Sequence, residues 1–346
     1  MLKKNISKVV VSFMIATLSL AGCGNSASNA SSDTPKDSEN KDSKIIIRVG
    51  HNVSPGSTAD NGALKFKELL EKKTNNAVEV QIFGNSQLGS ENDMMNLIQM
   101  SSLEMLITGD GPINTFIPQY GAITMPYVFR DVPHMLNAYN SPEVIDPINK
   151  DLIASKKLKI IDAWVRGPRN VTSNKKITKP EDMKGVKLRV PEMKVYVETW
   201  KTLGALPTPM AFSEVYAALS QNVVDGQENP YDLILTSSFY EVQKYLIKTQ
   251  HVIGPYLVVI GDEFLNGLPD DIKNSVVEAV KEAGDYANKE TLDSQEKMEI
   301  ELKNKGMEII EINRDEWVNA LKGLPEKLEK DLNWKPGFYK QLVDIK

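Results

Sequence analysis

Two arginines are the residues best suited to chemistry in this sequence, and both lie in the stretch from Trp164 to Pro230. Neither Arg169 nor Arg189 has an acidic residue beside it in the sequence. The planar guanidinium group of arginine can donate two parallel, charge-assisted hydrogen bonds to one carboxylate. The stretch therefore predicts a pocket that binds a small carboxylate without transforming it. Solvated arginines on the protein surface are the alternative interpretation.

Rigid backbone is expected around both arginines. Residues 186–190 alternate between apolar and basic side chains, which predicts a strand that carries Arg189 on one face and ends at Pro191. Arg169 follows a Gly-Pro pair, which predicts a loop of fixed shape. Such backbone would hold both guanidinium groups in a preformed site.

Asn229 and Phe212 are further candidates for the same pocket. Asn229 precedes Pro230, so its backbone is expected to be extended and the direction of its amide constrained. That amide could donate to a ligand oxygen, or the segment could be a structural turn. Phe212 ends a stiff loop with a proline in it, and could line a pocket or belong to the core.

Motifs for catalysis are missing from the sequence. The three histidines, His51, His134 and His251, are scattered, and none has a metal-binding partner three or four residues away. No GxSxG, GxGxxG or GxxxxGK[ST] pattern occurs. Residues 109–111 read GDG, which predicts a turn at the carboxyl end of a strand, where ligands bind in open α/β sheets. We predict no enzymatic activity, cofactor or metal site, although 46 acidic residues leave a carboxylate dyad open.

Alternating strands and helices are expected around these residues. The β-loop-α-β order at the start of the chain indicates a parallel sheet. Strands are expected at 45–50, 78–83, 103–107, 158–164, 186–190 and 252–261, and helices at 60–74, 92–100 and 194–203. A short helix is expected at 213–219, with Ser213 as its N-cap.

A long helix is expected at 268–306. Pro269 and two aspartates open it, and Gly306 is a plausible end. At 1.5 Å per residue the helix would be about 55 Å long, so it should lie across two lobes. A break near Gly284 is the alternative. The sequence thus predicts a two-lobed α/β fold whose chain crosses between lobes, with lobe I at 45–166 plus 255–294 and lobe II at 167–254 plus 295–346.

The N-terminus has the features of an export signal. Residues 1–22 contain three lysines followed by an apolar run that is too short to cross a bilayer, which needs about 20 residues. The run ends in Leu-Ala-Gly-Cys at Cys23, the only cysteine, and this motif resembles the lipobox of bacterial lipoproteins. We predict a lipoprotein signal peptide at 1–22 and a lipid anchor at Cys23, with an ordinary signal peptide as the alternative.

The composition limits the class of partner. Residues 24–44 contain no large apolar side chain, so residues 23–44 are expected to be a lipidated cysteine and a flexible tether. Hydrophobic residues make up 41% and charged residues 25%, as in soluble globular proteins. Removal of 1–22 would take away three lysines and change the net charge from −5 to about −8. Such an acidic chain is a poor candidate for binding nucleic acid.

Several motifs together resemble the solute-binding proteins of tripartite ATP-independent periplasmic (TRAP) transporters, of the DctP type. The motifs are RNVTSNKKITKPEDMKGVKLRVP at 169–191, PTPMAFSEVYAAL at 207–219, VVDGQENP at 223–230, QLGSE at 87–91 and MPYVF at 125–129. The resemblance extends from residue 45 to about 340. It implies a fold of two α/β lobes joined by crossing strands and a long shared helix.

The resemblance also implies site residues. Arg189 matches the arginine that pairs with the ligand carboxylate, and Arg169 a second arginine that supports it. Asn229 matches a ligand-contacting asparagine and Phe212 an aromatic residue of the pocket. Two further residues, Asn52 and Glu91, lie in loops that line the lobe I side in similar proteins.

The resemblance makes an organic acid the expected ligand. Gly109 stands where sialic-acid-binding members carry a glutamate, and polar loops rather than a further arginine are expected to face the carboxylate. A sugar acid such as a hexuronate or aldonate is therefore the first expectation and a C4-dicarboxylate the second. The implied partners are a large and a small membrane permease subunit. Two alternatives stay open: a secreted lyase or hydrolase acting on sugar acids, and a binding protein that serves a sensor kinase.

Overall fold

The computed structural model describes residues 44–346, which form one compact unit. The predicted signal peptide, Cys23 and tether lie outside the described residues, apart from residue 44. Among residues 44–346, no helix combines the length and apolarity that a membrane span requires.

A single mixed sheet of nine strands organises the protein. Its strands lie in the order β2-β1-β3-β8-β4-β7-β5-β6, and β9 pairs with β8. The strands are β1 (Ile45–Gly50), β2 (Val78–Phe83), β3 (Met105–Gly109), β4 (Leu158–Ser173), β5 (Lys187–Val190), β6 (Leu206–Pro209), β7 (Gly226–Asn229), β8 (Tyr245–Gly261) and β9 (Glu308–Ile310).

Helices cover the sheet along the chain. They are α1 (Thr58–Lys73), α2 (Glu91–Gln99), α3 (Gly111–Phe116), α4 (Val132–Asn140), α5 (Pro142–Lys156), α6 (Lys194–Thr202), α7 (Val215–Ser220), α8 (Tyr231–Thr236), α9 (Asp262–Gly267), α10 (Asp270–Asn304), α11 (Arg314–Ala320), α12 (Leu324–Asp331) and α13 (Phe338–Asp344). Short 3-10 helices include η1 (Pro118–Thr124) and η3 (Phe212–Glu214).

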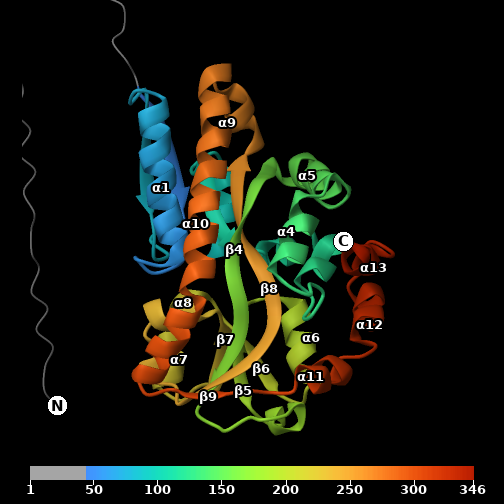
Figure 1. Cartoon of the computed structure of the whole chain (residues 1–346). Coiled ribbons are helices and arrows are strands. Elements are labelled where there is room, and N and C mark those ends of the chain that lie inside the picture. Colours follow the sequence, from blue (N-terminus) through green and yellow to red (C-terminus); the bar gives the residue numbers. More distant parts are fainter. Residues whose placement is uncertain (1–43) are drawn as a thin grey trace, which may run out of the picture. The chain divides into compact units, whose positions relative to one another are not determined.

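The two long strands β4 and β8 run side by side through the whole molecule (Figure 1). They pair in antiparallel fashion from Leu158 opposite Gly261 to Ser173 opposite Tyr245. The first part of this ribbon continues the sheet through β3, and the second part through β7 and β9. The ribbon therefore joins the two halves of the sheet, as expected for two lobes with crossing strands.

Each half contains parallel strands. In the first half β1 pairs in parallel with β2 and β3, which confirms the parallel arrangement predicted from the β-loop-α-β order. In the second half β5 pairs in parallel with β6 and β7. The pairs that involve β8 with β3 and β4, and β4 with β7, are antiparallel, so the complete sheet is mixed.

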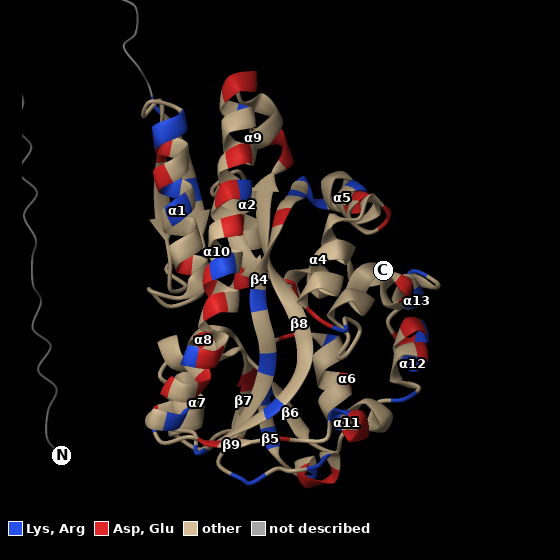
Figure 2. Cartoon of the chain, viewed as in Figure 1, with Lys and Arg blue, Asp and Glu red and all other residues tan. Residues whose placement is uncertain are grey.

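The helix α10 is continuous over 35 residues, or about 52 Å at 1.5 Å per residue. It packs against α1 and β4 and then against α8, alongside both halves of the sheet (Figure 1). Charged residues of both signs follow its outer side, as they do on α1 and α12 (Figure 2). The predicted helix that spans both lobes is confirmed, and the alternative break near Gly284 is wrong.

Gly284 has a packing role in α10. A Cβ atom at this position would lie 2.6 Å from Cδ1 of Trp164 and 2.7 Å from Oδ2 of Asp162, both on β4. The Trp164 ring is almost fully buried, and its Nε1 donates to Asp162. The glycine therefore lets the helix approach the crossing strand closely, and the helix tolerates it because the modest cost of a helical glycine is offset by this packing.

One local prediction fails. Ser213 is not the N-cap of a helix at 213–219, because residues 212–214 form the 3-10 helix η3 and α7 begins only at Val215 with Glu214 as its N-cap residue. The predicted lobe boundaries stay a prediction, since residues 44–346 are one compact unit. The C-terminal segment contacts the first half of the chain, for example through Lys335 N donating to Gln119 O.

Candidate functional site

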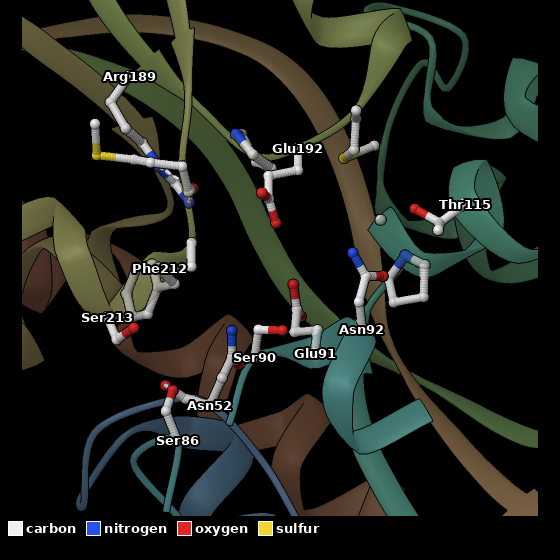
Figure 3. Close-up of a pocket in the computed structure, with 16 residues that line it drawn as sticks. Asn52, Ser86, Ser90, Glu91, Asn92, Thr115, Arg189, Glu192, Phe212 and Ser213 are labelled. Carbon is white, nitrogen blue, oxygen red and sulfur yellow. Dashed lines mark hydrogen bonds between the residues drawn. The ribbon is translucent and has the colours of Figure 1, made fainter. Parts of the chain in front are cut away.

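A cleft lies where the carboxyl ends of several strands meet, which is the usual place for ligands in open α/β sheets. We distinguish a deep chamber from an outer chamber that shares seven of its residues. The chambers contain about 360 and 470 Å³ of empty space, respectively, in the range of small-molecule sites. In Figure 3, Arg189, Phe212 and Glu192 line one side, and Asn52, Ser86 and Glu91 the other.

All six predicted ligand-binding residues line the deep chamber. Asn52 follows β1, Glu91 opens α2, Arg169 lies in β4, Arg189 in β5, Phe212 in η3 and Asn229 at the end of β7. The structure therefore brings together side chains that are up to 177 positions apart in the sequence. Their roles in binding stay predictions.

Arg189 points into the cleft as a buried cation. Its Nε and Nη2 atoms donate to the carbonyl oxygen of Met210 at 3.1 and 2.7 Å, and its guanidinium lies 6.0 Å from the ring centre of Phe212. Within residues 44–346, no carboxylate oxygen lies within 4.0 Å of its nitrogen atoms. Burial lowers the pKa of Arg189 to about 10, although the charge of Glu228 opposes this effect. The group is charged at neutral pH and has no anionic partner.

Arg169, in contrast, is paired with Glu228. Its Nε and Nη2 atoms donate to the two carboxylate oxygens of Glu228 at 2.5 and 2.7 Å. Burial by itself raises the pKa of Glu228, but the charge and hydrogen bonds of Arg169 outweigh burial and lower this pKa to about 2. The positive charge of Arg169 is therefore largely compensated inside the protein.

His251 completes this buried group. Its Nε2 lies 3.0 Å from Oε2 of Glu228, and its Nδ1 lies 2.9 Å from Oγ1 of Thr249. Burial lowers the pKa of His251, although the hydrogen bond to Glu228 opposes the shift. The neutral ring can thus donate from Nε2 to Glu228 while Nδ1 accepts from Thr249. The sequence showed His251 only as an isolated histidine and gave Glu228 no role.

The predicted loop around Arg169 is wrong. Arg169 belongs to β4, where it lies opposite Val252 of β8. The strand continues because Gly167, at φ +85°, lies in a bulge, so the glycine before Pro168 bends the strand without ending it.

Asn229 faces the chamber with its amide oxygen. Gln243 Nε2 donates to Val242 O at 3.1 Å, so Gln243 Oε1 is left to accept from Thr172 Oγ1 at 2.9 Å. Thr172 Oγ1 in turn accepts from Gln227 Nε2 at 2.9 Å, and Gln227 Oε1 accepts from Asn229 Nδ2 at 2.6 Å. This chain orients the amide, so Nδ2 is used inside the protein and Oδ1 is the free atom.

Glu91 is held at the opposite side of the chamber. Its Oε1 accepts from Thr108 Oγ1 at 2.7 Å and from the backbone N–H of Gly109 at 3.0 Å. Position 91 follows Ser90, which caps α2 together with Asp93 in a capping box. The cap thus fixes the helix end that presents Glu91 to the cleft.

Two residues of the deep chamber were missed by the sequence reasoning. Arg166 and Asp110 both line it. In a regular strand, residues three apart point to opposite faces, so Arg166 and Arg169 would not share a site. The pairing passes from Val165 opposite Pro255 to Pro168 opposite Ile253, which means that β4 carries one extra residue there. This bulge lets Arg166 and Arg169 line the same chamber.

Asp110 is the residue after β3 and is 4% exposed. Burial raises its pKa to about 6, although the charges of Arg166 and Arg169 oppose the shift. The GDG turn was expected at a strand end near a ligand, and only its aspartate enters the chamber wall beside Gly111.

The chemistry of the cleft suits binding. It offers a charged arginine without a partner, a second arginine beside it and several polar groups that can donate or accept hydrogen bonds. Within residues 44–346, no group of three or more His, Cys, Asp or Glu residues could hold a metal ion. A small organic anion is the kind of molecule that this arrangement can bind.

Comparisons with known proteins agree with this geometry. The family model described as bacterial extracellular solute-binding protein, family 7 (DctP) matches residues 49–331. The chain is 35% identical over 270 residues to a solute-binding protein of Roseobacter denitrificans, a match that covers 78% of this chain and 82% of the relative. The C4-dicarboxylate-binding periplasmic protein DctP of Rhodobacter capsulatus is 35% identical over 250 residues, which cover 70% of this chain and 73% of the relative.

Solved structures show the same fold. A TRAP periplasmic solute-binding protein of a Polaromonas species, bound to D-erythronate, matches with a TM-score of 0.82 and 30% identity over 88% of this chain and 99% of that chain. The R. denitrificans protein, with bound L-galactonate, matches with a TM-score of 0.78 and 32% identity over 84% of this chain and 98% of that chain. The chain therefore belongs to the DctP family of bacterial extracellular solute-binding proteins, family 7, as a TRAP solute-binding protein and not as an enzyme.

Proposed function

We propose that this protein captures a sugar acid, such as an aldonate or a hexuronate, outside the cytoplasm and delivers it to a TRAP permease. The observation that carries this proposal is Arg189, a buried and charged guanidinium without a carboxylate partner among residues 44–346. A buried cation is unfavourable unless an anion accompanies it. The carboxylate of a bound acid would supply that anion.

The outer chamber favours a hydroxylated acid over a C4-dicarboxylate. Apart from Arg189, its charged lining residues are Glu91 and Glu192, which lie across the chamber from each other (Figure 3). Two carboxylates would repel a second carboxylate on the ligand. The neutral polar residues of its lining are suited to hydroxyl groups: Asn52, Ser86, Ser90, Asn92, Thr115 and Ser213.

One reason given by the sequence for a sugar acid no longer holds by itself. No further arginine was expected to face the carboxylate, whereas Arg166 lines the deep chamber. The preference for a sugar acid therefore rests on the outer chamber and on the relatives. D-erythronate and L-galactonate are sugar acids bound by similar proteins, while the R. capsulatus relative is named for C4-dicarboxylates, which remain the second candidate.

Capture and delivery follow from this assignment. Closure of the two lobes over the acid would exclude water and strengthen the pairing of its carboxylate with Arg189, with Arg169 as a secondary contact. The closed form would then dock on a large and a small membrane subunit. Lipidation at Cys23 would keep the protein at the outer membrane–water boundary of the cell, and mass spectrometry of the protein purified from its natural host would detect the lipid on Cys23.

A panel of acids tests the proposed ligand class. The probes are D-galactonate, L-galactonate, D-erythronate, D-galacturonate and succinate, each followed by thermal unfolding and isothermal titration calorimetry. A sugar acid that binds the folded state should raise the melting temperature in proportion to the logarithm of its concentration over Kd. NMR of the recovered acid should show it unchanged. Binding of succinate alone would favour the C4-dicarboxylate candidate, and chemical turnover of any probe would contradict a pure binding protein.

A further inference from the structure

The deep chamber contains two buried oxygen atoms without a hydrogen-bond donor. Asp110 Oδ2 and Asn229 Oδ1 are both buried, and neither receives a hydrogen bond from any group among residues 44–346. Both residues line the deep chamber. A buried acceptor without a donor is unfavourable, so a bound molecule that supplies a donor here gains affinity.

A donor without an acceptor lies in the same chamber. Arg166 Nε is buried and donates to no acceptor among the described residues. The guanidinium is stacked 4.9 Å from the ring centre of Tyr256, which holds it in place. The chamber therefore presents an unused N–H donor and an unused carboxylate oxygen. A hydroxyl group complements this combination, because it donates and accepts at once, whereas a carboxylate only accepts.

Two glycines create the space for this pair. A Cβ atom at Gly109 would overlap the guanidinium of Arg166, and a Cβ atom at Gly254 would lie 2.8 Å from Asp110 Oδ2. Gly109 ends β3 and Gly254 lies in β8. Because both positions lack side chains, Arg166 and Asp110 can approach the backbone of the sheet from the cleft.

These free groups lie close to the proposed carboxylate position. Arg166, Arg169 and Arg189 line the deep chamber together with Asp110, and Asn229 lies opposite Asn170, the residue next to Arg169. A hydroxyl that reaches Asp110 must therefore be near the carboxylate that the arginines attract.

We propose that Asp110 and Arg166 bind the hydroxyl group on the carbon next to the ligand's carboxylate. The hydroxyl donates to Asp110 Oδ2 and accepts from Arg166. This assignment rests on the proposed function, since it requires a carboxylic acid in the cleft. It makes Asp110 a specificity-determining residue that selects 2-hydroxy acids against acids without that hydroxyl.

Matched ligands and variants test the assignment. Calorimetry compares D-galactonate, L-galactonate and D-erythronate with their 2-deoxy analogues, and the two galactonates also with their 3-deoxy analogues. The proteins are the wild type, Asp110→Ala and the control Asp285→Ala, which removes an exposed carboxylate on α10. For the wild type and the control, loss of the 2-hydroxyl should weaken binding about 10- to 100-fold, and loss of the 3-hydroxyl should weaken it less.

In Asp110→Ala, the parent acid and its 2-deoxy analogue should bind within about twofold of each other, because the acceptor that distinguishes them is gone. Equal binding of both acids by the wild type would overturn the assignment and leave the proposed function intact. Undiminished discrimination by Asp110→Ala would also overturn it. If the wild type bound none of these acids, the proposed function itself would fail. Should Asp110→Ala not fold, the wild-type comparison of 2-deoxy with 3-deoxy acids still decides.

Discussion

Arg169 donates to both carboxylate oxygens of Glu228, at 2.5 and 2.7 Å, and both side chains are buried. Arg189 lines the same chamber and, among the described residues, has only the carbonyl oxygen of Met210 as a hydrogen-bond acceptor. Two arginines that look equivalent in the sequence therefore differ in charge balance. One is compensated within the protein, and the other is available to an anion.

Arg189→Gln should abolish most of the affinity for a sugar acid. The variant removes the charged fork but keeps an amide that can donate to Met210, so we expect a loss of at least about 100-fold in Kd by calorimetry. The melting temperature of the unliganded protein should stay equal or rise, because an uncompensated buried charge is removed. Arg314→Gln is the matched control, since that arginine is exposed and stacks over Tyr127 away from the cleft lining. Unchanged affinity in Arg189→Gln would refute the binding mode.

Arg169→Met should damage stability more than Arg189→Met does. Removal of Arg169 leaves Glu228 buried without its partner, which costs about 3–5 kcal/mol in the free energy of unfolding. Urea unfolding at neutral pH measures this cost. The double variant Arg169→Met/Glu228→Leu should recover much of the loss, because no buried charge remains unpaired. A double variant no more stable than Arg169→Met would show that the ion pair is not the cause.

Glu228 should make stability depend on acid pH. Its pKa is about 2 in the folded protein against an ordinary value of 4.5. The carboxylate therefore contributes stability that is present above about pH 4.5 and is lost as the pH falls from 4.5 to 2, on the order of 3 kcal/mol in total. Unfolding experiments on the wild type and Glu228→Gln across this range isolate the contribution, because the other acidic groups remain in both proteins. Parallel pH profiles would argue against it.

Gly284→Ala should destabilise the protein although alanine favours helices. The added methyl group would lie 2.6 Å from Cδ1 of the buried Trp164 ring, so the helix or the strand must shift. We expect a loss of about 1–3 kcal/mol, measured by thermal or urea unfolding. Gly267→Ala is the control, because a Cβ atom there has no neighbour within 4 Å. Equal effects of the two substitutions would mean that the close packing of α10 on β4 matters little.

Local patterns in the sequence were sufficient for most elements. The apolar stripe of Ala63, Phe66 and Leu70 predicted the buried face of α1, and all three are buried in the structure. The period-two pattern of 78–83 predicted β2 with its observed bounds. Such patterns depend on near neighbours in the chain, so the sequence determines them directly. Fine detail escaped where local signals compete, as at Ser213, which a 3-10 turn displaces from the cap position.

The sequence also determined which six residues would gather, through motifs that resemble one family, but it did not determine their electrostatic states. Whether an arginine is free or paired depends on residues far away in the chain: Glu228 compensates Arg169 from 59 positions away. The place of Arg166 depends on one extra residue in the pairing of β4 with β8, which no periodic pattern reveals. Only the tertiary structure decided these points, because burial and charge pairing arise from contacts between segments that are distant in sequence.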